Sequence, residues 1–396
     1  MHDELSARQA AIRLRLAGEK VDSICRTLNR SPAWLHKWWR RYLESGPAGL
    51  YDLTRANQRV VNRTPPHIER AILTIRKRLA KRATAQTRYS LVGAAQIQAE
   101  LEKLDYSPVP CLRTIERIVA RAGLTCPPLH LAPRLARSQY PGPQAQDSNQ
   151  VHQVDVVGPR YLKGDKTRYY FLVCKDVFDQ AVYLEFVCSR SSQTVLTFLT
   201  HAWQELGLPN IVQFDNGREF CGWRTAAHSL CRVIRFCLRL DIEVLFIPEG
   251  KPCYNGAVEQ FNGWFQPLLL NRPYRRPADA RRQVKRLMTS VNEHHVHAHL
   301  GHCTSAQYRR SKSLRKLPAD CQLHQQKKLP LSVGKVSFIR LVSAKGTINV
   351  LGQQFKVGKR LKFQYVKATL YTKLRALKIY HKGRLTKQFG YKLSSK

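Results

Sequence analysis

The 396-residue sequence has no long apolar run and no closely paired cysteines. No stretch of about 18 consecutive apolar residues occurs, so we expect no membrane-spanning helix and no membrane partner. The N-terminal residues have no apolar segment behind a basic one, as a secretory signal would. The eleven cysteines include no Cys-x-x-Cys pair, which argues against a zinc ribbon or zinc finger. We therefore expect a cytoplasmic protein with free thiols.

Acidic residues are also scarce. Lysine and arginine total 67 against 27 aspartates and glutamates, which gives a formal net charge of +40. After Glu293 the only acidic residue is Asp320. A surface this basic needs a polyanionic partner, and nucleic acid is the default because each neutralised phosphate releases counterions. A ribosomal-type or membrane-surface protein is the alternative, but ribosomal proteins are usually shorter and lack the motifs described below.

Residues 6–45 have the pattern of three helices within a predicted DNA-binding domain, residues 1–60. Ser31 can cap the third helix, and Pro32 suits its first position. A short helix, a tight turn and a longer basic helix are typical of a helix-turn-helix. Leu35 and Trp38 share one face and should be core. The polar residues on the other faces are predicted to contact DNA: His36, Lys37, Arg40 and Arg41. A plain three-helix bundle with a solvated basic face is the alternative.

A second helical, winged-helix-like DNA-binding domain is predicted over residues 61–126. Its last helix carries arginines four residues apart on one outer stripe, and we expect these to contact DNA: Arg113, Arg117 and Arg121. Such a stripe is often only solvated, but its position after a helix-turn-helix in a basic chain favours a second DNA-binding unit. Residues 127–149 are rich in Pro, Gln and Ser and are predicted to be a linker.

From residue 150 the hydrophobic period changes from helical to strand-like. The predicted order over residues 150–275 is β-β-β-α-β-α-β-α, which forms a mixed five-stranded sheet covered by helices. Residues 276–330 are predicted to be a basic helical connector. Short alternating strands separated by glycines over residues 331–396 predict a small SH3-like β-barrel that binds DNA. The fold class is therefore multidomain α/β.

Three acidic residues stand where carboxylates are unexpected. Asp155 lies inside the apolar strand VHQVDVVG, where a carboxylate is costly unless it is paired or binds a metal. Asp215 directly follows the strand NIVQF, and Glu259 begins the last helix of this domain. The first and fourth strands are neighbours in this order, so the three side chains should converge. Oxygen ligands of this kind suit two Mg²⁺ or Mn²⁺ ions, which can catalyse phosphoryl transfer.

Most of the chain resembles the insertion-sequence transposases that share the catalytic core of retroviral integrases. The resemblance rests on HQVDVVGPRY, FDNGREF and PEGKPCYNGAVEQFNGWF, and flanking segments such as LHKWWRRYLESGPAGLYD and LRTIERIVARAGL agree with it. It implies a ribonuclease-H-like catalytic core in which Asp155, Asp215 and Glu259 are the catalytic, metal-binding triad. The implied reaction exposes a 3′-hydroxyl at the end of a mobile element and joins it to target DNA.

Two features depart from the family pattern. The interval from Asp215 to Glu259 is 44 residues, longer than usual, and we expect a longer helix over residues 226–240 to absorb the excess. Gln260 and Gly263 stand where many relatives have basic residues, which puts DNA contacts from that helix in doubt.

Other candidate ligands have simpler explanations. We expect four further acids near the same strands to cap turns or to face solvent: Asp176, Asp179, Glu185 and Glu219. A group of histidines with Cys303 matches no common zinc spacing, and we expect it to pack beside a DNA channel: His294, His295, His297, His299 and His302.

The sequence thus predicts a DNA transposase that binds double-stranded DNA, both element ends and target, as a homo-oligomer at the bacterial nucleoid. Whether an ATPase regulates it is left open. Two alternatives remain: a domesticated, catalytically silent DNA-binding protein, and a ribonuclease-H-like nuclease that cuts without joining. The intact triad argues against the first, and the additional DNA-binding units argue against the second.

Overall fold

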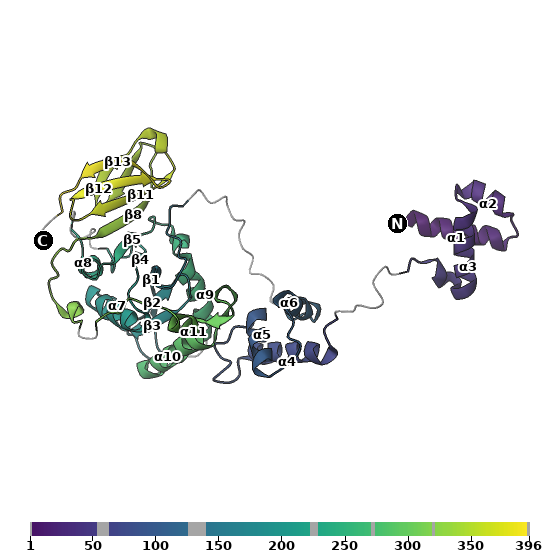
Figure 1. Ribbon diagram of the computed structural model, residues 1–396, viewed down its shortest axis with the longest axis horizontal. Coiled ribbons are helices and arrows are strands. Elements are labelled where there is room, and N and C mark those ends of the chain that lie inside the picture. Colours follow the sequence, from purple (N-terminus) through teal and green to yellow (C-terminus); the bar gives the residue numbers. More distant parts are fainter. Residues whose placement is uncertain are drawn as a thin grey trace. The chain divides into compact units, whose positions relative to one another are not determined.

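A computed structural model of the chain describes residues 2–53, 63–125, 140–221, 229–270, 274–318 and 321–393. The chain divides into two compact units, Met1–Arg63 and Thr64–Lys396 (Figure 1). Residue 126, the last of the predicted second DNA-binding domain, and residues 127–139 of the predicted linker lie outside the described residues. So do residues 226–228, the start of the helix predicted over residues 226–240.

The first unit consists of three α-helices and a 3₁₀ turn: α1 (His2–Leu16), α2 (Val21–Leu28), α3 (Pro32–Ser45) and η1 (Gly46–Leu50). Asn29 ends α2 in the left-handed region, with φ of 50°. The Ser31 hydroxyl caps α3 by accepting a hydrogen bond from the Trp34 amide at 3.2 Å. Ile24 and Leu35 are buried between the helices. The helix-turn-helix arrangement predicted from the sequence is present.

The second unit begins with three more helices, α4 (Pro66–Lys81), α5 (Ala94–Lys103) and α6 (Leu112–Arg121), and no strand is assigned among the described residues between 64 and 125. Their core includes Ile72, Ile97 and Ile115. The loop between α4 and α5 contacts the rest of the unit, because Tyr89 and Arg88 both donate to the side chain of Gln283.

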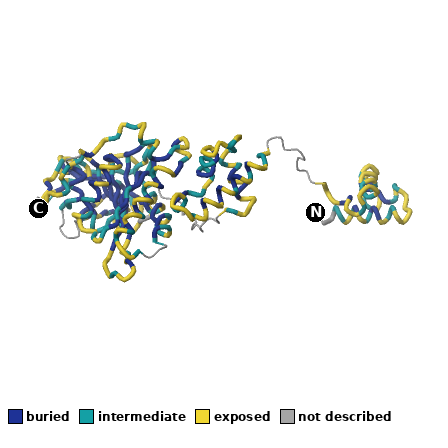
Figure 2. The backbone as a smooth tube through the Cα atoms, turned by 90° about the horizontal axis from the view of Figure 1, so that it is seen from below, coloured by how far each residue is buried: buried dark blue, intermediate teal, exposed yellow. Residues whose placement is uncertain are grey.

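The central sheet begins with the predicted order of elements: β1 (Val151–Arg160), β2 (Tyr169–Asp176), β3 (Val182–Val187), α7 (Ser192–Leu206), β4 (Ile211–Phe214), α8 (Arg232–Arg239), β5 (Glu243–Phe246) and α9 (Gly256–Leu270). The first three strands are antiparallel, and β4 and β5 run parallel to β1. Helices α7 and α8 bury their apolar residues on one face, around Trp203 and Phe236, and α9 covers the other around Phe265. Both faces are therefore buried (Figure 2), as expected for a ribonuclease-H-like core.

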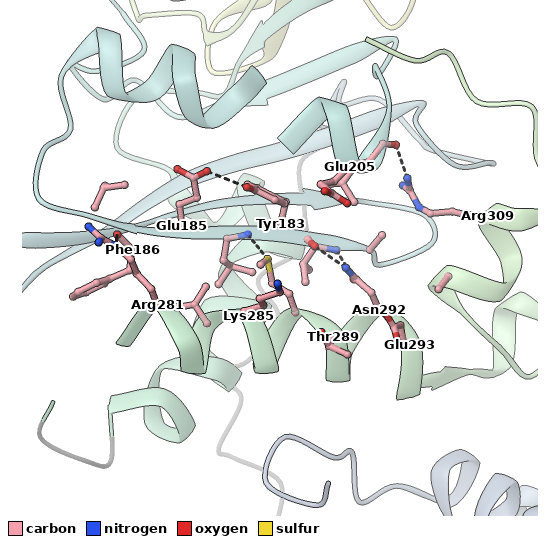
Figure 3. A pocket seen from close by; sticks show the side chains of 18 residues that line it. Tyr183, Glu185, Phe186, Glu205, Arg281, Lys285, Thr289, Asn292, Glu293 and Arg309 are labelled. Atoms are coloured by element: carbon pink, nitrogen blue, oxygen red, sulfur yellow. Dashed lines mark hydrogen bonds between the residues drawn. The ribbon is translucent and has the colours of Figure 1, made fainter. Parts of the chain in front are cut away.

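Strand β3 is one edge of this sheet, and α10 (Pro277–His294) covers it. The Asn292 amide donates to and accepts from the backbone of Val182, at 2.9 Å in each direction. Met288 accepts from the Leu184 amide at 3.0 Å, and Arg281 donates to the Phe186 carbonyl at 3.3 Å. Figure 3 shows these side chains along a hollow of about 830 Å³ between β3 and α10. The outward backbone groups of this edge strand are thus occupied by helix side chains.

The segment between α10 and the C-terminal strands contains β6 (Val296–His297), η3 (Ala298–Leu300), β7 (Cys303–Thr304), α11 (Ser305–Arg310) and η4 (Leu323–Gln325). Thr304 and Gln307 form a capping box at the start of α11. Within the described residues no helix is both long and apolar enough to cross a membrane.

The C-terminal strands are β8 (Lys335–Leu341), β9 (Thr347–Val350), β10 (Gln353–Lys356), β11 (Tyr365–Tyr371), β12 (Ala376–His381) and β13 (Arg384–Gly390); a further turn, η5, covers Lys359–Leu361. The small β-barrel predicted over residues 331–396 is not confirmed, because the sheet is not closed. Strand β8 pairs in parallel with β5, so the strands form one open nine-stranded sheet in the order β13-β12-β11-β8-β5-β4-β1-β2-β3. Alternating short strands suit an open sheet as well as a barrel, and here β8 satisfies the otherwise unpaired edge of β5. Strands β9 and β10 form a separate hairpin.

Candidate active site

Three carboxylates lie on neighbouring elements of the central sheet. Asp155 is in the middle of β1, and Asp215 follows β4, the parallel neighbour of β1. Glu259 lies in the first turn of α9, which packs on β1. Each of the three side chains is partly buried. The sequence-predicted residues therefore share one region, on the face of the sheet covered by α9.

The charge of Asp215 acts on Asp155, and the charge of Asp155 acts on Glu259. Burial raises the pKa of Asp155, and the charges of Asp215 and Glu219 raise it further. Burial raises the pKa of Glu259, with a further contribution from Asp155. Burial also raises the pKa of Asp215. Since like charges in a desolvated site disfavour ionisation, the region is suited to binding a cation.

The chemistry of these donors fits Mg²⁺ or Mn²⁺, which prefer carboxylate oxygens. The described residues nevertheless contain no group of three or more histidine, cysteine, aspartate or glutamate side chains arranged to hold a metal ion as they stand. The carboxylates are instead hydrogen-bonded locally. Asp155 accepts from the Val156 amide at 2.8 Å and from the Asn262 side chain at 2.6 Å, and Asp215 accepts from the Gly217 amide at 2.9 Å.

Sequence reasoning missed a set of buried amides that hold α9 against the sheet. Gln153 and Gln213 are paired residues on β1 and β4, each two positions before an aspartate. Gln153 accepts from the Val258 amide at 3.0 Å, and Gln213 donates to the Tyr254 carbonyl at 2.9 Å. Asn255 donates to the Val154 carbonyl. The signal in the sequence is a glutamine in each apolar strand at the same offset from its aspartate.

Asn262 is a second residue that sequence reasoning missed. It lies one turn after Glu259 on α9 and donates to Asp155, so it joins α9 directly to the β1 carboxylate.

Glu219 lies closer to the site than expected. Its side chain is only 8% exposed, and Arg190 is 3.8 Å away. A Cβ atom added at Gly217 would lie 2.9 Å from the Asp215 carboxylate and 2.9 Å from that of Glu219. Glycine at 217 therefore lets two carboxylates pack on either side of the turn. Glu219 therefore does not face solvent, one of the two roles expected of it, and its charge adds to burial in raising the pKa of Asp155.

The other acids near these strands are engaged elsewhere. Asp176 and Asp179 are fully buried and form ion pairs with Arg309, at 2.9 Å and 2.7 Å. Asp176 accepts from two turn amides, as expected of a cap, but neither acid faces solvent. Glu185 lies 2.7 Å from the His201 ring.

The histidines do not form a metal group within the described residues. His295 is buried and its ring contacts the Tyr89 carbonyl at 2.6 Å, while His299 contacts the Phe178 carbonyl at 2.8 Å. Burial lowers the pKa of His295 to about 4, with smaller contributions from neighbouring positive charges, so its ring is neutral at pH 7.

The predicted DNA contacts differ in availability. On α3, His36, Lys37 and Arg40 are exposed, but Arg41 is half-buried and donates to the Tyr51 carbonyl. The α6 arginines Arg113, Arg117 and Arg121 are exposed. Arg121 forms an ion pair with Glu69 at 3.1 Å.

Two parts of the chain match known protein families. Residues 145–252 match the Integrase core domain, and residues 3–51 match the Homeodomain-like domain. The resemblance noted from the sequence is thereby confirmed. The matched part of the integrase core includes Asp155 and Asp215 and ends shortly before Glu259.

Solved structures that resemble this chain are also integrases. The HTLV-2 integrase catalytic core domain in complex with magnesium, in its trimeric form, is 22% identical, with a TM-score of 0.33 over 42% of this chain and 99% of that chain. The simian T-cell lymphotropic virus intasome in complex with PP2A regulatory subunit B56 gamma is 19% identical, with a TM-score of 0.38 over 76% of this chain and 97% of that chain. The catalytic core domain of BIV integrase is 17% identical, with a TM-score of 0.32 over 41% and 96% of the two chains.

Proposed function

We propose that this protein is an insertion-sequence DNA transposase that cuts element ends and joins them to target DNA. The observation that carries the proposal is a set of three partly buried carboxylates: Asp155, Asp215 and Glu259. In addition to burial, the charge of Asp215 raises the pKa of Asp155, and the charge of Asp155 raises that of Glu259. The two aspartates lie within the match to the Integrase core domain. Among the described residues, no lysine or arginine forms an ion pair with any of the three. A divalent cation would supply the neutralising charge.

Asp155, Asp215 and Glu259 would hold two Mg²⁺ or Mn²⁺ ions. When bound, such ions lower the pKa of an attacking hydroxyl and stabilise the charge on the leaving oxygen. Glu259 has to turn toward the aspartates for this, and its position in the first turn of α9 leaves its side chain partly exposed and able to do so. Asn262 keeps the Asp155 carboxylate oriented, and the Gly217 amide does the same for Asp215.

The reaction has two steps. Water first attacks a phosphorus at the element end: a P–O bond forms, the bond to the 3′-oxygen breaks, and that oxygen takes a proton. The new 3′-hydroxyl then attacks a target phosphorus and displaces the target's own 3′-oxygen. Neither step needs a covalent intermediate with the protein, so the side chains serve to position and to neutralise.

The remaining parts of the chain would bind DNA. We propose that α3 and α6 recognise element ends through His36, Lys37, Arg40, Arg113 and Arg117, which are exposed. The C-terminal strands present Lys335, Lys367 and Lys378 near Tyr371. This basic, aromatic face suits a DNA backbone. Joining two ends requires at least a dimer on DNA, at the nucleoid if the host is bacterial.

The decisive experiment incubates the purified full chain with labelled element-end DNA, target DNA and Mg²⁺ or Mn²⁺. We expect joined product, which should fall at least about 1,000-fold in Asp155→Asn, Asp215→Asn and Glu259→Gln. End binding, measured by mobility shift, should persist in all three. Cleavage without joining would indicate a nuclease, and binding without cleavage a DNA-binding regulator. Strand transfer that survives in all three variants would refute the proposal.

A further inference from the structure

A buried arginine from the C-terminal strands reaches the loop that carries Asp215. Arg340 lies on β8, and its side chain is 7% exposed. Its guanidinium donates to three backbone carbonyls, those of Asn349 at 3.1 Å, Ile339 at 2.9 Å and Ile247 at 3.2 Å. It also donates to the side-chain oxygen of Asn216 at 3.1 Å.

Asn216 is held at both ends of its amide. Its oxygen accepts from Arg340, and its nitrogen donates to the Ile247 carbonyl at 2.7 Å. The Ile247 carbonyl thus accepts from both side chains, and the Ile247 amide donates to Phe214 at the end of β4. The three residues tie the turn after β4 to the end of β5. Asn216 directly follows Asp215, so this tie fixes the backbone from which that carboxylate extends.

Burying a guanidinium is costly, and little opposite charge surrounds this one. The nearest acid is Glu249, at 3.7 Å and more than half exposed. Burial lowers the pKa of Arg340 to about 10. A lysine would keep the charge but could not reach four acceptors with a planar fork. The arrangement therefore depends on the shape of the arginine as well as its charge.

The geometry points to Arg340 as a positioning residue for the metal site, acting through Asn216 on Asp215. The C-terminal strands then complete the active site as well as binding DNA. This inference rests on the proposed function, because Asp215 matters only if it holds a metal ion. It also explains why a buried cation is placed on β8, outside the integrase core match at residues 145–252.

The test is a double-mutant cycle on the full chain with Arg340→Lys, Asn216→Ala and the double variant. The first measurement is the dissociation constant for Mn²⁺ by isothermal titration calorimetry. We expect each single change to weaken Mn²⁺ binding by about 10-fold, as outer-shell partners of metal ligands do, and the double variant to be no worse than either. Strand transfer should fall alongside, and raising the Mn²⁺ concentration should restore it. Element-end binding should not change.

A matched control is Arg76→Lys. Arg76 is as buried as Arg340 and donates to the carbonyls of Leu124 and Val92, in the helical part before the integrase core. It should lose thermal stability without any change in Mn²⁺ affinity. If Arg340→Lys unfolds the protein, Asn216→Ala alone decides, since the loop is then perturbed without a buried charge.

Wild-type Mn²⁺ affinity in the Asn216 and Arg340 variants, or additive losses in the cycle, would overturn the inference. If the wild-type chain itself neither binds Mn²⁺ nor joins DNA, the proposed function fails first. The two failures are therefore distinguishable.

Discussion

The sheet carries two groups of buried acids, and the chain treats them differently. Near the start of β1, Asp176 and Asp179 are fully buried and paired with Arg309, and His152 lies 3.4 Å from Asp176. Further along β1, Asp155 is close enough to Asp215 and Glu219 for their charges to raise its pKa beyond the effect of burial, and the half-exposed Arg190 lies 3.8 Å from Glu219. We refer to Asp176 and Asp179 as the closed acids. We refer to the three proposed metal ligands, Asp155, Asp215 and Glu259, as the open acids.

Within the closed acids the pKa of Asp179 is raised, by burial and by the charge of Asp176, whereas the pKa of Asp176 is lowered. Burial works to raise the pKa of Asp176, but the hydrogen bond and charge of His152 and the charge of Arg309 outweigh it and lower that pKa. For the open acids the raising effects prevail. Acids that stabilise the fold are paired with a cationic side chain of the protein. Acids that bind a metal ion need that position free of protein cations. The presence of Arg309 beside the closed acids, rather than the direction of their pKa shifts, separates the structural from the proposed catalytic carboxylates.

The largest expected effect on the free energy of unfolding comes from removing Arg309, the arginine paired with the closed acids. Arg309→Met should lower the free energy of unfolding by about 3–5 kcal/mol, because it leaves two buried carboxylates without a cation. The midpoint of urea denaturation measures this. Arg310→Met, at the exposed neighbouring position, should change it by less than about 0.5 kcal/mol. Equal effects of the two changes would show that the closed acids need no internal cation.

The second prediction supplies a cation to the open acids. Mn²⁺ at about 100 times its dissociation constant should stabilise the wild-type chain by about 2.7 kcal/mol, since it binds only the folded state. Thermal melting at increasing Mn²⁺ concentrations gives this value. Asp215→Asn should abolish most of the gain. Equal stabilisation of the variant would place the ion elsewhere.

In the absence of metal ions, Asp215→Asn should increase the free energy of unfolding. The pKa of Asp215 is raised above 3.8, so the folded state loses stability as the pH rises from 3.8 through that raised value. Asp215→Asn removes this loss, and its oxygen can still accept from the Gly217 amide. We expect a gain on the order of 1 kcal/mol at pH 7 and none below pH 3.8. Urea denaturation at both pH values checks it; destabilisation at pH 7 would contradict it.

The smallest effect should come from Glu259. It is the least buried of the open acids, so solvent weakens its repulsion from Asp155. Glu259→Gln should raise metal-free stability at pH 7 by no more than a few tenths of a kcal/mol. A gain larger than that of Asp215→Asn would mean that Glu259 already lies deep among the aspartates.

Local patterns in the sequence were enough to predict the core of the fold. The alternation in β1 to β3 and the apolar strands β4 and β5 predicted the mixed sheet, and the carboxylates of Asp155 and Asp215 stood out because charge is rare in such strands. The helix-turn-helix was predictable for a similar reason, since Ser31 and Pro32 mark the start of α3.

The rest depends on contacts between distant residues, which local patterns do not encode. The pairing of β5 with β8 joins residues about ninety positions apart, and a strand that extends a sheet has the same alternation as one in a barrel. Arg340 and Arg309 looked like any other residues of a basic chain. Nothing near them in the sequence indicated that Asn216 or Asp176 would be their partners.

The parallel pairing of β5 with β8 links the register of the C-terminal strands to the proposed active site. Phe246 lies opposite Phe338, and their rings stack with centroids 5.4 Å apart. Because side chains alternate along a strand, sliding β8 by one residue would turn Arg340 to the opposite face and bring Ile339 toward Asn216. The connection before β8 could therefore gain or lose residues with little effect on this contact. An insertion between Phe338 and Arg340 would break the hydrogen bond between Arg340 and Asn216, beside Asp215.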